Sequence, residues 1–382
     1  MNRVEVRPDL FRWARQRARL GPAALAKRFP KLREWESGAT QPTLKQLEEF
    51  AQTTHTPIGF LFLPEPPNEA VPIPDFRTVG STGVRAPSAN LLDTIYVCQQ
   101  RQEWYRDFAR ASGENPLSFV GSVKAGSDVV AAAATIRTTL GFDLEQRRQA
   151  PTWADALREF IASADAVGIL VMCSGIVLNN THRKLDPEEF RGFALTDPLA
   201  PVVFVNGADT KSAQMFTLAH ELVHVWLGQS ALSDAQPRRL ADGDIEQWCN
   251  RVAAELLVPI AAMREVYNPR AALESEVSRL AKRFKVSTLV ILRRIHDVGG
   301  LTRDAFWAAY DAELMRLLSI PREGGGGNFH LTEAARVSKR FARAIVGSTL
   351  EGHTLYRDAF RMLGLTKMKT FQSFGRSLGV MP

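Results

Sequence analysis

The chain has 382 residues, and its content of 45% hydrophobic and 23% charged residues is that of ordinary globular proteins, which argues against wholesale disorder. The longest apolar stretch, at residues 168–178, is much shorter than the roughly 18 residues that cross a membrane. The charged N-terminus lacks the apolar region of a signal peptide, and the three cysteines are widely spaced with no CxxC pair. We therefore expect no membrane span, no disulfide framework and a cytoplasmic location.

The net charge of +7 is unevenly distributed along the chain. Residues 1–64 carry 11 Lys and Arg against 6 Asp and Glu, and residues 321–382 carry 10 against 4. The two ends therefore contribute +5 and +6, and the middle contributes −4. Basic ends are typical of a nucleic-acid surface, but solvated helix faces that are rich in arginine give the same pattern.

Proline and glycine predict two boundaries. Six prolines between Pro57 and Pro74 fix φ and remove backbone donors, so this stretch is expected to be an extended linker. The four glycines at residues 324–327 are not expected to hold an ordered helix. We therefore predict four parts: a small helical unit at 1–64, the linker with a helical segment at 65–150, a core at 151–323, and a helical C-terminal extension at 324–382.

Short β runs precede a long helix in the predicted core. Thr152 with Asp155 three residues on resembles a capping box. The runs Ile169 to Cys173 and Pro201 to Asn206 predict strands, with residues 190–198 between them as a third. The predicted fold class is α+β, mainly helical, with a small sheet in the core.

The candidate catalytic and metal-binding residues lie in residues 210–228, TKSAQMFTLAHELVHVWLG, where His220, Glu221 and His224 spell HExxH. Apolar residues recur there at helical spacing, and residues four apart on a helix point from one face, so both imidazoles can bind one cation. Histidine nitrogen suits Zn²⁺, which takes three protein ligands at a catalytic site and leaves a fourth position for water. Glu221 is placed to take a proton from that water. The alternative is a helix with two structural histidines and no metal.

A third ligand is expected downstream, and Glu246 is the stronger of two candidates. Glu246 and Asn250 are four residues apart, so Glu246 can complete the site while Asn250 holds a ligand imidazole. Glu255 is the competitor, although it lies in the apolar run AAELLVP, where its side chain could also point to solvent. Cys249 could in principle bind zinc, but a lone cysteine is more commonly a buried thiol.

These motifs give the chain a resemblance to a known family. FTLAHELVHVWLG, followed by ExxCNxxAAELLVP, is similar to the ImmA/IrrE family of zinc metallopeptidases, in the long form with an N-terminal Xre-type helix-turn-helix domain and a C-terminal extension. The resemblance extends to WESGATQPTLKQLEEFA, PIPDFRT, RGFALTDPLAPVVFVNGADTK, GNFHLTEAARVSKRF and STLEGHTLYRDAF. Only the metal motifs are specific to chemistry.

The resemblance implies a zincin-like peptidase core and particular residue roles. In this family the two histidines and the glutamate of the ExxxN helix bind zinc, which here implies His220, His224 and Glu246. The glutamate of HExxH is the catalytic base, which implies Glu221. Well-understood members cleave, or are required to cleave, Xre-type repressors after a stress or mobile-element signal, so a repressor is the implied protein substrate.

The N-terminal unit resembles a shortened Xre domain. In an ordinary domain a positioning helix is followed by a turn and then by a recognition helix whose first residues reach the bases. Here Phe29 leads through Pro30 directly into KLREWESG, so part of the turn and the start of the recognition helix are missing. Lys31 and Arg33 remain as possible phosphate contacts. The alternative is a degenerate Xre fold that recognises a partner or docks on the peptidase core.

A second helix-turn-helix pattern is predicted near residues 276–298, within the core. It comprises a short helix, a turn at residues 285–287 and a second helix with Arg293 and Arg294 available for phosphates. Residues 289–292 are apolar almost all round the helix, which favours a buried packing element instead.

The leading hypothesis is a zinc-dependent endopeptidase that acts on a protein, with Tyr267 and His353 as equally supported candidates for the oxyanion donor. The runner-up is a regulator that binds DNA or a partner toxin, as an antitoxin does, and keeps a structural or latent zinc site. A third hypothesis is a latent protease whose cleft is covered by the N-terminal unit and the basic tail until a signal releases them.

Overall fold

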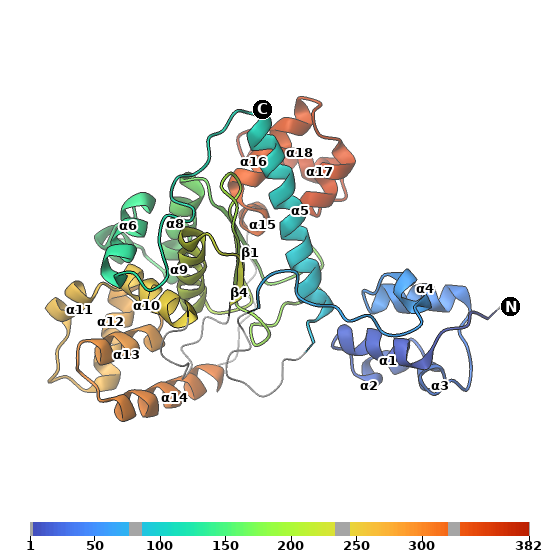
Figure 1. Cartoon of the computed structure of the whole chain (residues 1–382), viewed down its shortest axis with the longest axis horizontal. Coiled ribbons are helices and arrows are strands. Elements are labelled where there is room, and N and C mark those ends of the chain that lie inside the picture. Colours follow the sequence, from blue (N-terminus) through green and yellow to red (C-terminus); the bar gives the residue numbers. More distant parts are fainter. Residues whose placement is uncertain (1–2, 76–85, 234–244, 320–328, 382) are drawn as a thin grey trace. The chain divides into compact units, whose positions relative to one another are not determined.

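The computed structural model describes residues 3–75, 86–233, 245–319 and 329–381, which are mainly helical with one small sheet (Figure 1). The chain divides into two compact units. The first unit comprises Met1–Pro72 and Ser81–Tyr96, and the second comprises Ile73–Gly80 and Val97–Pro382. None of the described helices is both long and apolar enough to span a membrane.

The first unit is built around an aromatic cluster. Phe11, Phe29, Trp35 and Phe50 are buried, and their ring centroids lie 5.3 to 6.3 Å apart, a spacing at which such pairs stabilise a core beyond the area they bury. Thr43 forms a capping box at the start of the helix Leu44–Thr53. The elements of this unit are α1 (Pro8–Arg17), α2 (Pro22–Ala26), α3 (Leu32–Ser37), α4 (Leu44–Thr53) and the 3₁₀ turn η1 (Ile58–Phe62), and α5 (Ala89–Ala111) begins here and continues into the second unit.

The second unit contains a four-stranded sheet in the order β1-β3-β2-β4. Its strands are β1 (Leu170–Ser174), β2 (Gly192–Leu195), β3 (Val202–Asn206) and β4 (Ala231–Ser233). β1 is parallel to β3, whereas β2 is antiparallel to both β3 and β4. The three predicted strands are therefore confirmed as β1 to β3, and β4 is an addition at the edge of the sheet.

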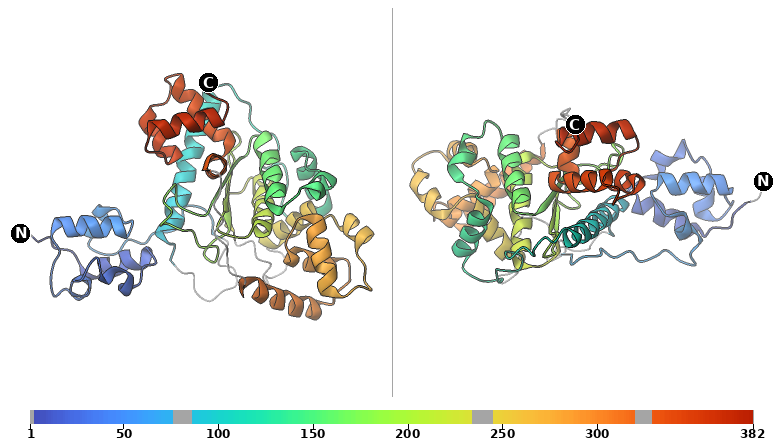
Figure 2. Two further views of the ribbon diagram at one scale, coloured as in Figure 1. Left: turned by 180° about the vertical axis from the view of Figure 1, so that it is seen from behind. Right: turned by 90° about the horizontal axis from the view of Figure 1, so that it is seen from above.

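Helices cover both faces of this sheet (Figures 1 and 2). On one face, α9 (Lys211–Leu227) packs on β2 and β3, with α8 (Trp153–Ala166) beside it. On the other face, the Sγ of Cys98 in α5 lies 3.7 Å from the Sδ of Met172 in β1. The next residue, Cys173, instead faces α9, with its Sγ 3.4 Å from Gln214 Oε1. This alternation is the one expected of a strand buried on both faces.

In α8, Thr152 and Asp155 form the predicted capping box. The remaining helices of the second unit surround this core. These helices are α6 (Val129–Leu140), α7 (Leu144–Gln149), α10 (Ile245–Leu257), α11 (Ile260–Val266), α12 (Leu273–Phe284), α13 (Thr288–Asp297), α14 (Arg303–Ser319), α15 (Phe329–Val337), α16 (Lys339–Leu350), α17 (Tyr356–Leu363) and α18 (Met368–Ser377).

The C-terminal residues are helical, as expected, and they lie within the second unit rather than apart from it. Arg101 of α5 donates to the carbonyl oxygen of Met362 at 2.9 Å and to that of Arg336 at 3.3 Å. Ser338 donates to Asp165 of α8 at 2.8 Å. The predicted boundary at residues 324–327 lies outside the described residues.

Candidate metal centre

Helix α9 presents the two histidines of HExxH from one face. Thr210 caps its start and accepts from Ala213 N, and Gly228, at φ 70°, ends it. His220 and His224 are both fully buried, and their Nε2 atoms are 3.2 Å apart. The one-turn spacing in the sequence therefore converges the two nitrogens on one point.

Helix α10 brings a carboxylate to the same point. Glu246 Oε2 lies 3.1 Å from His220 Nε2, and Glu246 Oε1 lies 3.2 Å from His224 Nε2. The three side chains offer donor atoms that all lie within 4.8 Å of one another, and the described residues contain no second group of this kind. The structure thus brings together the three residues that sequence reasoning selected.

This donor set fits a zinc ion. Two imidazole nitrogens and one carboxylate oxygen are a common catalytic zinc ligand set. Glu221, beside the first histidine, is also fully buried, and its Oε1 has no hydrogen-bond partner among the described residues. A buried carboxylate oxygen without a donor is costly, and a water molecule at the metal would supply that donor.

Burial and mutual charge shift the ionisation of the two carboxylates in opposite directions. Burial raises the pKa of Glu221 to about 8, because desolvation penalises the charged form. Burial also opposes the charge of Glu246, but the imidazoles of His220 and His224 outweigh it and hold the pKa of Glu246 well below its usual value. The lowered pKa favours the charged form of Glu246, which is the form that binds a metal.

Two further residues contact this group. Asn250, one turn after Glu246 on α10, places its Oδ1 3.0 Å from His220 Nδ1. Ser233, fully buried in β4, places its Oγ 3.4 Å from Glu221 Oε2 and 3.3 Å from His224 Nε2. Asn250 was selected from its spacing to Glu246, whereas Ser233 was missed, because its position depends on the pairing of a three-residue strand that has no periodic signal.

Glycine at position 192 allows α9 to lie close to the sheet. A Cβ on Gly192 in β2 would lie 2.6 Å from Thr217 Cγ2, 2.8 Å from the carbonyl oxygen of Phe204 and 3.1 Å from Glu221 Cγ. These distances are shorter than packed carbon atoms tolerate. The absence of a side chain at Gly192 is therefore needed for the position of the HExxH helix.

We expect Gly192→Ala to displace α9, destabilising the fold by about 1–3 kcal/mol, the usual cost of overpacking a core, and lowering the zinc content. Thermal unfolding and elemental analysis of the purified variant measure the two effects. Gly59→Ala is a suitable control, because a Cβ on Gly59 meets nothing within 4 Å. Equal stability and zinc content in the two variants would contradict this account.

The carboxylate of Glu255 binds groups outside the cluster of His220, His224 and Glu246. Its carboxylate forms a buried ion pair with Arg294 of α13 and accepts from the backbone N of Ile260 at 3.1 and 3.2 Å. The carbonyl oxygens of Glu255 and Leu257, at the end of α10, accept from Arg137 and Arg147, respectively. These arginines satisfy terminal carbonyls of the helix that carries Glu246.

The remaining candidate ligand is Cys249, and the two candidate oxyanion donors are Tyr267 and His353. Cys249 is fully buried in the apolar core of the second unit. The hydroxyl of Tyr267, after α11, lies against Gly300. His353 follows α16, and its backbone N donates to the carbonyl oxygen of Ser348. None of these three belongs to the group of three donors.

The helix-turn-helix near residues 276–298 packs into the apolar core of the second unit. Its helices α12 and α13 form as predicted, with Lys285 at φ 52° in the turn. Arg294 is buried, so the sequence-based expectation that it is available for phosphates is wrong. Arg293 is bonded to Asp297 at 3.1 Å. In the first unit, by contrast, Lys31 and Arg33 are both exposed.

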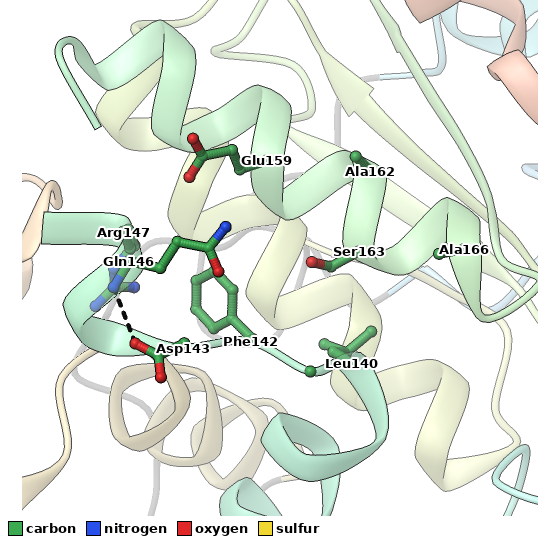
Figure 3. A pocket seen from close by; sticks show the side chains of 10 residues that line it. Leu140, Phe142, Asp143, Gln146, Arg147, Glu159, Ala162, Ser163 and Ala166 are labelled. Carbon is green, nitrogen blue, oxygen red and sulfur yellow. Dashed lines mark hydrogen bonds between the residues drawn. The ribbon is translucent and has the colours of Figure 1, made fainter. Parts of the chain in front are cut away.

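A pocket of about 340 Å³ is lined by none of the three candidate metal ligands. Figure 3 shows Glu159 and Ser163 on α8 across from Phe142 and Gln146. Asp143, which also lines it, caps α7 by accepting from the backbone of Gln146 at 2.9 Å. This carboxylate thus has a role within the fold.

A buried HExxH helix packed on a small sheet, with a carboxylate supplied by a second helix, is the arrangement of zinc-dependent peptidases. Residues 164–296 match the Peptidase M78 family, described as the IrrE N-terminal-like domain. Residues 337–377 match a domain of unknown function, DUF8813.

The radiation response metalloprotease IrrE of Deinococcus radiodurans is 38% identical to this chain over 99 residues, which are 24% of this chain and 29% of IrrE. The chain thus spans less than a third of the length of this relative. Both similarities are to metallopeptidases of the IrrE type, and the M78 match includes the helices α9 and α10 that carry His220, His224 and Glu246.

Proposed function

We propose that the chain is a zinc-dependent endopeptidase that cleaves a protein, and that the protein is an Xre-type transcriptional repressor in stress or mobile-element regulation. The observation that carries the proposal is the convergence of His220, His224 and Glu246 beside the buried carboxylate of Glu221. The repressor follows from the family resemblance alone.

In this proposal His220, His224 and Glu246 hold the zinc ion. When bound, zinc supplies a Lewis acid that polarises the peptide carbonyl and makes water more acidic. Glu221 takes a proton from the attacking water at Oε1, the oxygen without a partner among the described residues, and returns it to the leaving amine. Ser233 orients the other oxygen, Oε2, from 3.4 Å. The burial of this group excludes bulk water from the proton transfer.

The test is cleavage of purified Xre-type repressors by the zinc-loaded full chain, with the fragments identified by mass spectrometry. The proposal expects one discrete cut in at least one repressor and its loss after chelation of zinc. Intact repressors throughout the panel would contradict the substrate class, and a cut that persists in chelator would contradict the zinc-dependent reaction.

We expect Asn250→Ala to weaken zinc binding by about 10–100-fold, because groups that orient a ligand imidazole contribute this much to metal affinity. Competition against a fluorescent zinc chelator measures the change. The matched control is Arg251→Ala, at the next position on α10, where the side chain is exposed. Equal zinc affinity in the two variants would refute the orienting role of Asn250.

A further inference from the structure

The C-terminal helices α17 and α18 are joined by a short turn, and this pair differs from the two predicted helix-turn-helix patterns. In the first unit, α2 and α3 have only five and six residues, and the second helix of the core pattern, α13, is largely buried. In contrast, α17 and α18 have eight and ten residues, are joined by residues 364–367, and lie with α16 beside α5 (Figure 2).

The turn between these helices has a defined geometry. Gly364 adopts φ 70° and donates to the carbonyl oxygen of Arg361 at 3.2 Å, and Leu365 N donates to that of Phe360 at 2.8 Å. This pair of bonds forms a Schellman motif, in which a glycine with positive φ ends the helix. Leu365 is buried, so the turn is anchored in the core. A short turn that contains glycine is typical of DNA-binding helix pairs.

One face of α18 is fixed against its neighbours. Phe371 and Phe374 are fully buried, and the Phe371 ring lies 5.5 Å from that of Tyr356 and 5.5 Å from that of Phe360 in α17. A Cβ on Gly375 would lie 3.2 Å from Val346 Cγ1 of α16. The three helices are therefore packed closely, and the opposite face of α18 is held rigidly toward solvent.

That solvent face is basic and polar. Lys369 and Arg376 are exposed and are seven residues apart, so they lie on the same side of α18. Gln372 and Ser373, between them, are half-buried. Residues 359–382 contain four Lys and Arg and no Asp or Glu. The last acidic residue before α18 is therefore Asp358 in α17, and α18 itself carries no acidic side chain.

We propose that α17 and α18 bind double-stranded DNA, with α18 in the major groove. Lys369 and Arg376 match phosphate oxygens, while Gln372 and Ser373 carry the donor and acceptor groups that read base edges. The surface lies within residues 337–377, the matched domain of unknown function.

Charge favours DNA over an acidic protein as the occupant. Leu355, Tyr356 and Met368 are exposed at the starts of α17 and α18, as in many protein interfaces. However, lysine is depleted from protein–protein interfaces. Exposed Lys367 and Lys369 lie on either side of Met368, and this favours DNA as the partner.

The test measures binding of the full chain to a labelled 30-base-pair duplex of random sequence, by fluorescence anisotropy between roughly 50 and 200 mM salt. Lys369→Ala/Arg376→Ala is compared with the matched pair Lys31→Ala/Arg33→Ala in the first unit. We expect the α18 pair to weaken binding by roughly tenfold or more and to reduce the salt slope by about two, one per lost phosphate contact. The first-unit pair should bind as the wild type does.

Both pairs are exposed, so thermal unfolding of the variants should match the wild type and show that the fold is intact. The proposal is overturned by absence of duplex binding at the lowest salt, or by loss of binding in the Lys31 and Arg33 pair alone. It is also overturned if poly-glutamate competes as well as unlabelled duplex at equal charge, because the surface would then suit an acidic polypeptide.

Discussion

Glu221→Gln should retain zinc and lose peptide cleavage by roughly 10²–10⁴-fold, the usual contribution of a general acid–base group. Glutamine has the same shape as glutamate, so the buried position should fold normally, but an amide cannot take a proton from water. Cleavage of a repressor that the wild type cuts, followed by densitometry, gives the rate, and elemental analysis gives the zinc content.

The control for this variant is His220→Ala, which should lose zinc together with activity because it removes a donor atom. The contrast separates a residue that moves a proton from one that holds the metal. Turnover near the wild-type rate in Glu221→Gln would remove Glu221 from the mechanism.

Glu246→Ala and Glu255→Ala should have different effects, although both glutamates lie on α10. Removing Glu246 deletes one of the three donors, so zinc should fall far below one equivalent. Removing Glu255 deletes the buried partner of Arg294 and leaves it paired with Asp297 at 2.9 Å, and breaking a buried pair in this way costs about 3 kcal/mol or more. This variant should therefore retain zinc and unfold at lower denaturant concentration, which elemental analysis and urea titration would reveal.

The outcome that contradicts this assignment is loss of zinc from Glu255→Ala at a denaturant concentration where the chain is still folded. Full zinc occupancy in Glu246→Ala would be equally damaging. In either case the third ligand would have to be sought elsewhere.

Local patterns were sufficient to predict the two helices that carry His220, His224 and Glu246. The spacings of His220 to His224 and of Glu246 to Asn250 are properties of a single helix, and a helix fixes which side chains share a face. The choice between Glu246 and Glu255 depended on burial and on the position of Arg294, which is 39 residues from Glu255 along the chain. The sequence favoured Glu246, which the structure places beside His220 and His224, but the ion pair that occupies Glu255 is a tertiary contact.

Features that depend on contacts between distant segments were not predicted. Ser233 reaches Glu221 only because β4 pairs with β2, and Gly192 matters only because α9 crosses that strand. Similarly, the apolar character of α13 was visible in the sequence, but the burial of Arg294 required its partner on α10. Such contacts leave no periodic pattern in one sequence.

The outer edge of β4 is covered by residues 74 and 75, which has a consequence for any peptide that approaches it. The backbone N of Leu232 in β4 donates to the carbonyl oxygen of Pro74 at 2.9 Å, and Asp75 continues this pairing as a parallel bridge. A peptide that adds as a strand to this edge, one residue from Ser233, must first displace these residues. Part of the binding energy of such a peptide would be spent on releasing the chain's own segment, so a peptide that pairs weakly would not occupy this edge.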